Sequence, residues 1–130
     1  MQLTEPIRCR MVACREALDD GGVWSFYLIN DSPVAFDSAV LFEVSYEWGD
    51  IGSSETTNVS VNELAPAASA LIWRDNGDGA ELRMYLSLRV RIGEREAQIQ
   101  FEFPKLYNIK NLPMVDGLGK PGWQATAEAR

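Results

Sequence analysis

This 130-residue chain contains no histidine, so metal binding would have to come from its carboxylates and its two cysteines. Histidine is the commonest general base and the commonest metal ligand, so Ser-His-Asp and Cys-His hydrolases are excluded. A zinc site would depend on carboxylates and two cysteines, whose spacing does not supply one. We therefore predict no catalytic residue, no metal site and no cofactor.

Glu43 and Glu47 are the carboxylates whose spacing can be compared with a known reaction. They alternate with apolar residues in a predicted strand, residues 40–48. Four residues along a strand separate them by about 13 Å, whereas the paired carboxylates of glycosidases lie roughly 5 to 9.5 Å apart. A histidine-free enzyme is therefore the third hypothesis for this chain, and the two glutamates are candidates for an acidic binding face.

The two cysteines, Cys9 and Cys14, are five residues apart in a segment predicted to be a strand. An extended chain places them about 16 Å apart on opposite faces, which a disulfide cannot span. We expect reduced, partly buried thiols without a redox role.

The acidic charge is concentrated in the first half of the chain. The formal net charge is −7, and residues 16–73 contain ten Asp or Glu and no Lys or Arg. Such a surface repels phosphate backbones, so we expect no nucleic-acid partner. The acidity either keeps the protein soluble or attracts a basic partner.

Membrane contact is not expected either. The sequence has no apolar run of the eighteen or so residues that a membrane span needs, and residues 1–15 lack the apolar stretch of a signal peptide. We therefore expect a cytoplasmic protein. Its length suits one domain with its own core.

The strongest structural signal is the strict alternation of apolar and polar residues over residues 80–103. Residues 92–95 carry Gly93 at the first central position, as a type II′ hairpin turn requires. This turn sets a register in which Leu86 faces Phe101 and Arg91 faces Glu96. We predict a β-hairpin.

The outward side of this hairpin carries Arg83 and Arg89, which are candidates for binding an anionic ligand or an acidic partner. The competing interpretation is pairing with Glu96 and Glu102 on the neighbouring strand. Such surface contacts are worth under about 1 kcal/mol each, yet they would neutralise the arginines. We favour the pairing.

The remaining strands define the fold class. They are predicted at residues 7–18, with a bulge near Val12, and at residues 23–30, 40–48, 56–62 and 70–74. Seven strands with turns at this spacing predict an all-β, immunoglobulin-like antiparallel β-sandwich, with a barrel as the alternative. One domain spans residues 1–123, including an irregular segment from residue 104 that packs on a sheet, and residues 124–130 are expected to fray.

Two groups of residues are candidates for partner binding. Trp123, Met114 and Leu118 are apolar residues of the irregular segment, although packing within the molecule is the favoured interpretation. Leu41 is predicted to point outward near Glu43, which favours homodimerisation through that sheet. The leading hypothesis is a non-catalytic interaction or structural module that binds a protein partner or itself.

The alternative from another class is a carbohydrate- or small-ligand-binding sandwich. Tyr27 and Tyr85 are the aromatic residues most suited to an exposed position on a strand, and Arg83 and Arg89 could supply polar contacts. Aromatic residues of a sandwich belong mostly to the core, which makes this the second hypothesis.

Two short stretches resemble a known domain. An Asn-Asp-Ser turn at residues 30–32 and a Lys-Leu-Tyr stretch at residues 105–107 resemble features of the β-sandwich domain that accompanies Smr-type nuclease domains in some bacterial proteins. More generally, the strand layout is similar to bacterial immunoglobulin-like modules. The resemblance implies an accessory, non-catalytic domain and transfers no functional residue.

Overall fold

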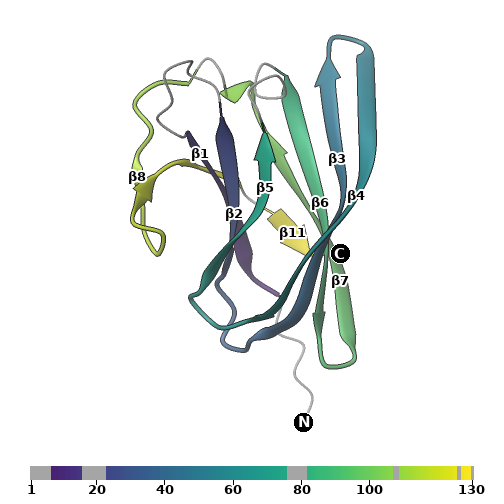
Figure 1. Cartoon of the computed structure of the whole chain (residues 1–130), viewed down its shortest axis with the longest axis vertical. Coiled ribbons are helices and arrows are strands. Elements are labelled where there is room, and N and C mark those ends of the chain that lie inside the picture. The colour runs from purple at the N-terminus through teal and green to yellow at the C-terminus, as the bar shows by residue number, and fades with distance from the viewer. Residues whose placement is uncertain (1–6, 16–22, 76–81, 107–108, 126, 130) are drawn as a thin grey trace.

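Two antiparallel sheets stacked face to face make up the fold (Figure 1). The computed structural model describes residues 7–15, 23–75, 82–106, 109–125 and 127–129, and these contain no α-helix. The first sheet has the order β10-β1-β2-β5, formed by β1 (Cys9–Arg15), β2 (Trp24–Asn30), β5 (Ser69–Asp75) and β10 (Trp123–Ala125). The prediction of an all-β fold with two stacked sheets is confirmed.

The second sheet is wider and has the order β11-β7-β6-β3-β4. Its strands are β3 (Phe36–Trp48), β4 (Ile51–Leu64), β6 (Arg83–Ile92), β7 (Arg95–Phe103) and β11 (Ala127–Ala129). The strand predicted at residues 56–62 therefore begins earlier, because a two-residue turn at Gly49 joins β3 directly to β4. Residues 16–18 and 80–81 of the predicted strands lie outside the described residues.

The predicted hairpin is confirmed as β6 and β7, with the expected register. Leu86 faces Phe101 and Arg91 faces Glu96. Gly93 has a φ of 61°, as the first central residue of a type II′ turn requires, and its amide donates to an Asp37 carboxylate oxygen at 2.6 Å. The ion pair across the hairpin differs from the expected one. Glu96 lies opposite Arg91, but its carboxylate is 3.9 Å from the guanidinium of Arg89.

The core lies between the two sheets, where alternate side chains of each strand meet. Phe26 and Leu28 enter it from the first sheet, and Leu86, Phe101 and Phe103 enter from the second. The rings of Phe26 and Phe103 meet edge to face, with centroids 5.1 Å apart at 84°. Aromatic pairs prefer this geometry, so the contact joins the two layers directly.

Strand β1 is buried on both faces, which explains its irregular hydrophobic pattern. Its register with β2 is continuous from Cys9 to Arg15, so the predicted bulge near Val12 is wrong. Met11 belongs to the main core, whereas Val12 and Cys14 belong to a second cluster on the outer face. The loss of alternation reflects a second covering layer and not an extra residue.

The covering layer is the C-terminal segment, which crosses the outer face of the first sheet beside β1 and β2 (Figure 1). It contains a small two-stranded sheet, β8 (Met114–Val115) and β9 (Lys120–Pro121). It then returns as β10, paired with β1, and β11, paired with β7. The prediction that residues 124–130 fray is wrong for these strands, because the open edges of β1 and β7 pair with them.

Arg10 fastens this segment to β1. Its guanidinium binds both carboxylate oxygens of Asp31, at 2.6 and 2.9 Å, and donates to the Asp116 carbonyl oxygen at 2.9 Å and to Gln124 Oε1 at 3.0 Å. The hydrogen bond to Asp31 is the main reason that the pKa of Arg10 is raised. One fixed charge thus connects three separate parts of the chain.

A bulge in β3 reverses the expected orientation of Leu41. The register with β6 shifts between Leu41 and Glu43, so Phe42 is an extra residue on β3. Before the bulge Leu41 points into the core and is 0% exposed, and after it Val44 points inward. The prediction of an outward Leu41 is wrong, and its argument for a homodimer is removed.

We predict that Gly122→Ala destabilises the protein by roughly 1–3 kcal/mol, because overpacking a filled site has a cost of this size. A Cβ at Gly122 would lie 2.6 Å from Val12 Cγ1 and 3.0 Å from the Ala13 carbonyl oxygen. Urea denaturation measures the difference. Gly52→Ala is the control, since its Cβ would meet nothing closer than 3.4 Å. Equal stability of the two variants would contradict the close packing at Gly122.

Candidate interaction surface

The two outer faces of the sandwich differ in what covers them. On the first sheet, Val115 and Leu118 of the C-terminal segment pack against Val12, Cys14 and Ile29. On the second sheet, residues of β3, β4, β6 and β7 line two hollows. The second sheet therefore has an uncovered outer face with two surface hollows.

The predicted apolar contacts of the C-terminal segment divide into two kinds. Leu118 packs on the second cluster, and Trp123 packs against the main core while half-buried. Met114 is 67% exposed. The structure thus gives Leu118 and Trp123 an intramolecular packing role and leaves Met114 facing solvent.

The two tyrosines predicted as ligand contacts lie on different sheets. Tyr27 belongs to β2, where Lys120 donates to its hydroxyl at 3.0 Å and lies 4.7 Å from its ring centroid. Tyr85 belongs to β6, on the outer face of the second sheet. They cannot contribute to one binding site.

A polar cluster on the outer face of the second sheet brings together several predicted residues. The Tyr85 hydroxyl donates to Glu47 Oε1 at 3.2 Å, and Arg83 pairs with Glu102 at 2.6 Å and approaches Glu47 at 4.0 Å. Partial burial, and then the bond to Glu47, raise the pKa of Tyr85. The expected pairing of the arginines with Glu96 and Glu102 is present, although Glu96 approaches Arg89 and not Arg91, the residue opposite it.

Next to this cluster is a hollow of about 300 Å³, here called the Gly52 hollow. Glu47 and Tyr85 form its inner wall, and Ser45 and Ser54 add hydroxyl groups. Gly52 lies directly opposite Glu47 and has no side chain, which leaves space between them. The hollow is polar and carries a carboxylate.

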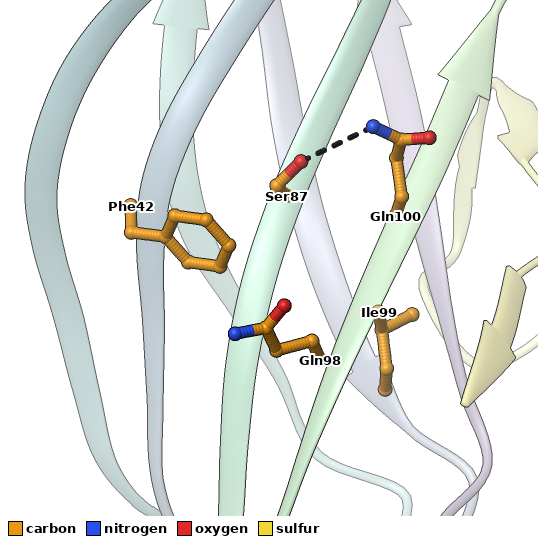
Figure 2. Close-up of a pocket in the computed structure, with 5 residues that line it drawn as sticks. All are labelled: Phe42, Ser87, Gln98, Ile99 and Gln100. Atoms are coloured by element: carbon orange, nitrogen blue, oxygen red, sulfur yellow. Dashed lines mark hydrogen bonds between the residues drawn. The ribbon is translucent and has the colours of Figure 1, made fainter. Parts of the chain in front are cut away.

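A second hollow, of about 250 Å³, lies further along the same face and is here called the Phe42 hollow. Figure 2 shows the Phe42 ring and the Gln98 and Gln100 amides arranged around Ser87. Gln100 Nε2 donates to Ser87 Oγ at 3.4 Å, and the Arg89 guanidinium lies 4.7 Å from the Phe42 ring centroid. The bulge that buries Leu41 is what turns Phe42 outward.

The predicted acidic face is present on β3. Glu43 and Glu47 are two residue pairs apart and point to the outer side, since Val44 between them points inward. Glu43 lies opposite Ser87 of β6, and Glu47 lies opposite Arg83. Glu47 lines the Gly52 hollow, whereas Glu43 is not among the residues that line either hollow.

The edge strand β4 is a feature that the sequence reasoning missed. It has 14 residues, borders the second sheet, and is largely exposed on both faces. No described strand pairs with its outer side, and it contains no Lys, Arg or Pro. Natural edge strands are usually short or protected by such residues. Residues 51–55 are Ile-Gly-Ser-Ser-Glu and lack the Thr and Val residues of the stretch that follows, so little in the sequence signals the early start of β4.

The turn at Gly49 fixes which backbone groups of β4 point outward. Trp48 and Ile51 close a two-residue hairpin, so their amides and carbonyls bind each other. Hydrogen-bonded and non-hydrogen-bonded residue pairs alternate along the two strands from this turn. The backbone N–H and C=O groups of Gly52, Ser54 and Thr56 therefore point away from β3. Their side-chain positions share the outer face, because their partners are Glu47, Ser45 and Glu43.

Groups of metal ligands and membrane-spanning helices are both absent from the part of the chain that the structure describes. It contains no group of three or more His, Cys, Asp or Glu that could hold a metal ion. No helix among these residues is long and apolar enough to cross a membrane. Cys9 is half-buried and Cys14 is buried, and no disulfide joins them.

Comparisons with family models, with curated proteins and with solved structures gave no match to this chain. The resemblance to sandwich domains that accompany Smr-type nuclease domains therefore stays a prediction from the sequence.

We predict that the thiol of Cys9 is unreactive in the folded protein at pH 8. Burial, and then the charge of Asp31, raise the pKa of Cys9 from 9.0 to about 12. The thiolate is the reactive species, so a thiol reagent should modify Cys9 only after urea unfolding. Modification of native Cys9 at the rate of an unfolded cysteine would contradict this.

The same shift predicts the pH dependence of stability. Because the folded-state pKa is the higher one, the contribution of Cys9 is complete below pH 9.0 and is lost as the pH rises toward about 12. Cys9→Ala should therefore show a smaller fall in urea midpoint between pH 8 and pH 11 than the unsubstituted protein.

Proposed function

We propose that this protein is a non-catalytic interaction module, an immunoglobulin-like sandwich that binds an extended segment of a protein partner as an added strand on β4. The observation that carries the proposal is the open edge of β4, 14 residues long. Strand addition uses backbone hydrogen bonds for affinity and neighbouring side-chain pockets for specificity. A setting in the bacterial cytoplasm is the sequence-based expectation for this module.

The charge of the surrounding surface supports a basic partner and not a second copy. The strands β3 and β4 carry five carboxylates and no basic residue: Asp37, Glu43, Glu47, Glu55 and Glu63. A second copy would bring the same negative charge to the edge, whereas lysine or arginine on a partner segment would complement it. Edge-to-edge dimerisation is therefore an outcome for the test to detect.

We predict that an acetylated and amidated octapeptide of alternating Lys and Val binds to β4 at 0.15 M salt, where long-range attraction is screened. The amides of Gly52, Ser54 and Thr56 should become protected from hydrogen exchange, because they point away from β3. Nuclear magnetic resonance titration and exchange measure both effects. A Glu-Val octapeptide should bind at least about tenfold more weakly, a difference of about 1.4 kcal/mol.

Ser54→Pro removes one outward amide and should reduce binding of the Lys-Val peptide by about tenfold or more. Ser54→Ala keeps the amide and is the matched control. Both variants should retain the thermal unfolding transition. Binding that is unchanged in Ser54→Pro, or dimerisation through β4 in light scattering, would overturn the proposal.

A second candidate function is binding of a carbohydrate in the Phe42 hollow. The observation that favours it is the combination of an aromatic ring, two amides and a hydroxyl around one cavity (Figure 2). Amides and hydroxyls can both donate to and accept from sugar hydroxyls, and a ring edge or face packs on the apolar side of a sugar.

For this candidate we predict millimolar binding of at least one of glucose, galactose and N-acetylglucosamine, detected as chemical-shift changes at Gln98 and Gln100. Phe42→Ala should abolish the changes, while Tyr27→Phe on the opposite sheet should leave them. If none of the three sugars changes these signals at about 50 mM, a concentration far above a millimolar Kd, the candidate is excluded.

A further inference from the structure

We infer that the Gly52 hollow receives a lysine side chain from the strand that pairs with β4, and this rests on the function proposed above. The hollow opens beside Gly52 and Ser54, whose backbone groups point toward the added strand. A residue of the partner paired with either of them places its side chain on the same outer face. The hollow is thus next to the first residues that strand addition would engage.

The missing side chain at Gly52 opens the way from the edge to Glu47. Neighbouring strands are about 4.8 Å apart, so the added strand and β3 would be separated by about 9.6 Å. A lysine side chain reaches about 6 Å and a glutamate about 4 Å, which together span this distance. A side chain at position 52 would occupy the space between them.

The charge around the hollow favours a cation. Arg83 is the basic residue beside Glu47, yet it lies 2.6 Å from Glu102 and only 4.0 Å from Glu47. Two carboxylates therefore share one guanidinium, which leaves one negative charge uncompensated within this group. The closer pairing with Glu102 leaves Glu47 as the carboxylate that can accept another donor.

The polar groups around Glu47 suit an ammonium group. The Tyr85 hydroxyl oxygen and the hydroxyls of Ser45 and Ser54 are acceptors on the walls of the same hollow. An ammonium has three donors that can be directed to separate acceptors, whereas a guanidinium is a planar fork. The Tyr85 ring adds a face for the aliphatic stem and the charge.

The test compares two octapeptides, one of alternating Lys and Val and one of alternating Thr and Val. The variants are Glu47→Gln, Glu43→Gln, Gly52→Ala and Ser54→Pro. Glu47→Gln should weaken binding of the Lys-Val peptide by about tenfold and leave the Thr-Val peptide unchanged. Glu43→Gln removes the same charge from the same strand, about 13 Å away, and is the matched control. Gly52→Ala should weaken the Lys-Val peptide by narrowing the hollow.

The outcomes separate this inference from the proposed function. Equal losses of affinity for the Lys-Val peptide in Glu47→Gln and Glu43→Gln would show a general electrostatic attraction to the acidic strand. That result would overturn the lysine pocket. If Glu47→Gln binds the Lys-Val peptide as well as the unsubstituted protein does, while Ser54→Pro still weakens binding, the lysine pocket is overturned and strand addition stands. Binding of both peptides that is insensitive to Ser54→Pro would overturn both. Thermal unfolding of each variant confirms that it is folded.

Discussion

Packing of the C-terminal segment on the outer face of β1 and β2 is the constraint on which the rest of the surface depends. Val115 and Leu118 of this segment cover Val12, Cys14 and Ile29, so β1 is buried on both faces. A two-layer sandwich has two outer faces, and this contact covers the β1 part of one of them. Among the described residues, no such segment covers the outer face of the second sheet or its β4 edge.

One extra residue in β3 shapes that remaining face. The bulge at Phe42 lets Leu41 fill the core and Val44 follow it inward, while the Phe42 ring turns out beside Ser87. Bulges often redirect a side chain at the cost of one irregular pair. Here the same irregularity completes the core and supplies the aromatic wall of a surface hollow.

Edge exposure and negative charge act together on β4. An exposed strand of this length would ordinarily invite pairing with any other strand, including its own copy. The carboxylates on β3 and β4 oppose pairing with an acidic copy and favour a basic segment. Five of the ten Asp and Glu residues of residues 16–73 lie on β3 and β4, at the only long open edge among the described strands.

Much of the candidate site could be anticipated one residue at a time, but not as a site. Glu47, Arg83 and Tyr85 were each candidates from the sequence, and strand pairing of β3 with β6 brings them together. Tyr27 was an equal candidate, yet it lies on the opposite sheet under Lys120. Which strands become neighbours depends on pairing between segments far apart in the chain, and no local pattern encodes it.

By itself the sequence determined the all-β class and the β6–β7 hairpin, because period-two alternation and Gly93 act over neighbouring residues. Tertiary structure decided the orientation of Leu41, the double burial of Val12 and the ordering of residues 123–125. Each of these depends on a contact with a distant part of the chain: three strands meeting at a bulge, a covering segment a hundred residues later, and an edge that accepts a final strand. A hydrophobic pattern indicates that a residue is buried, but only the folded structure shows which other segment covers it.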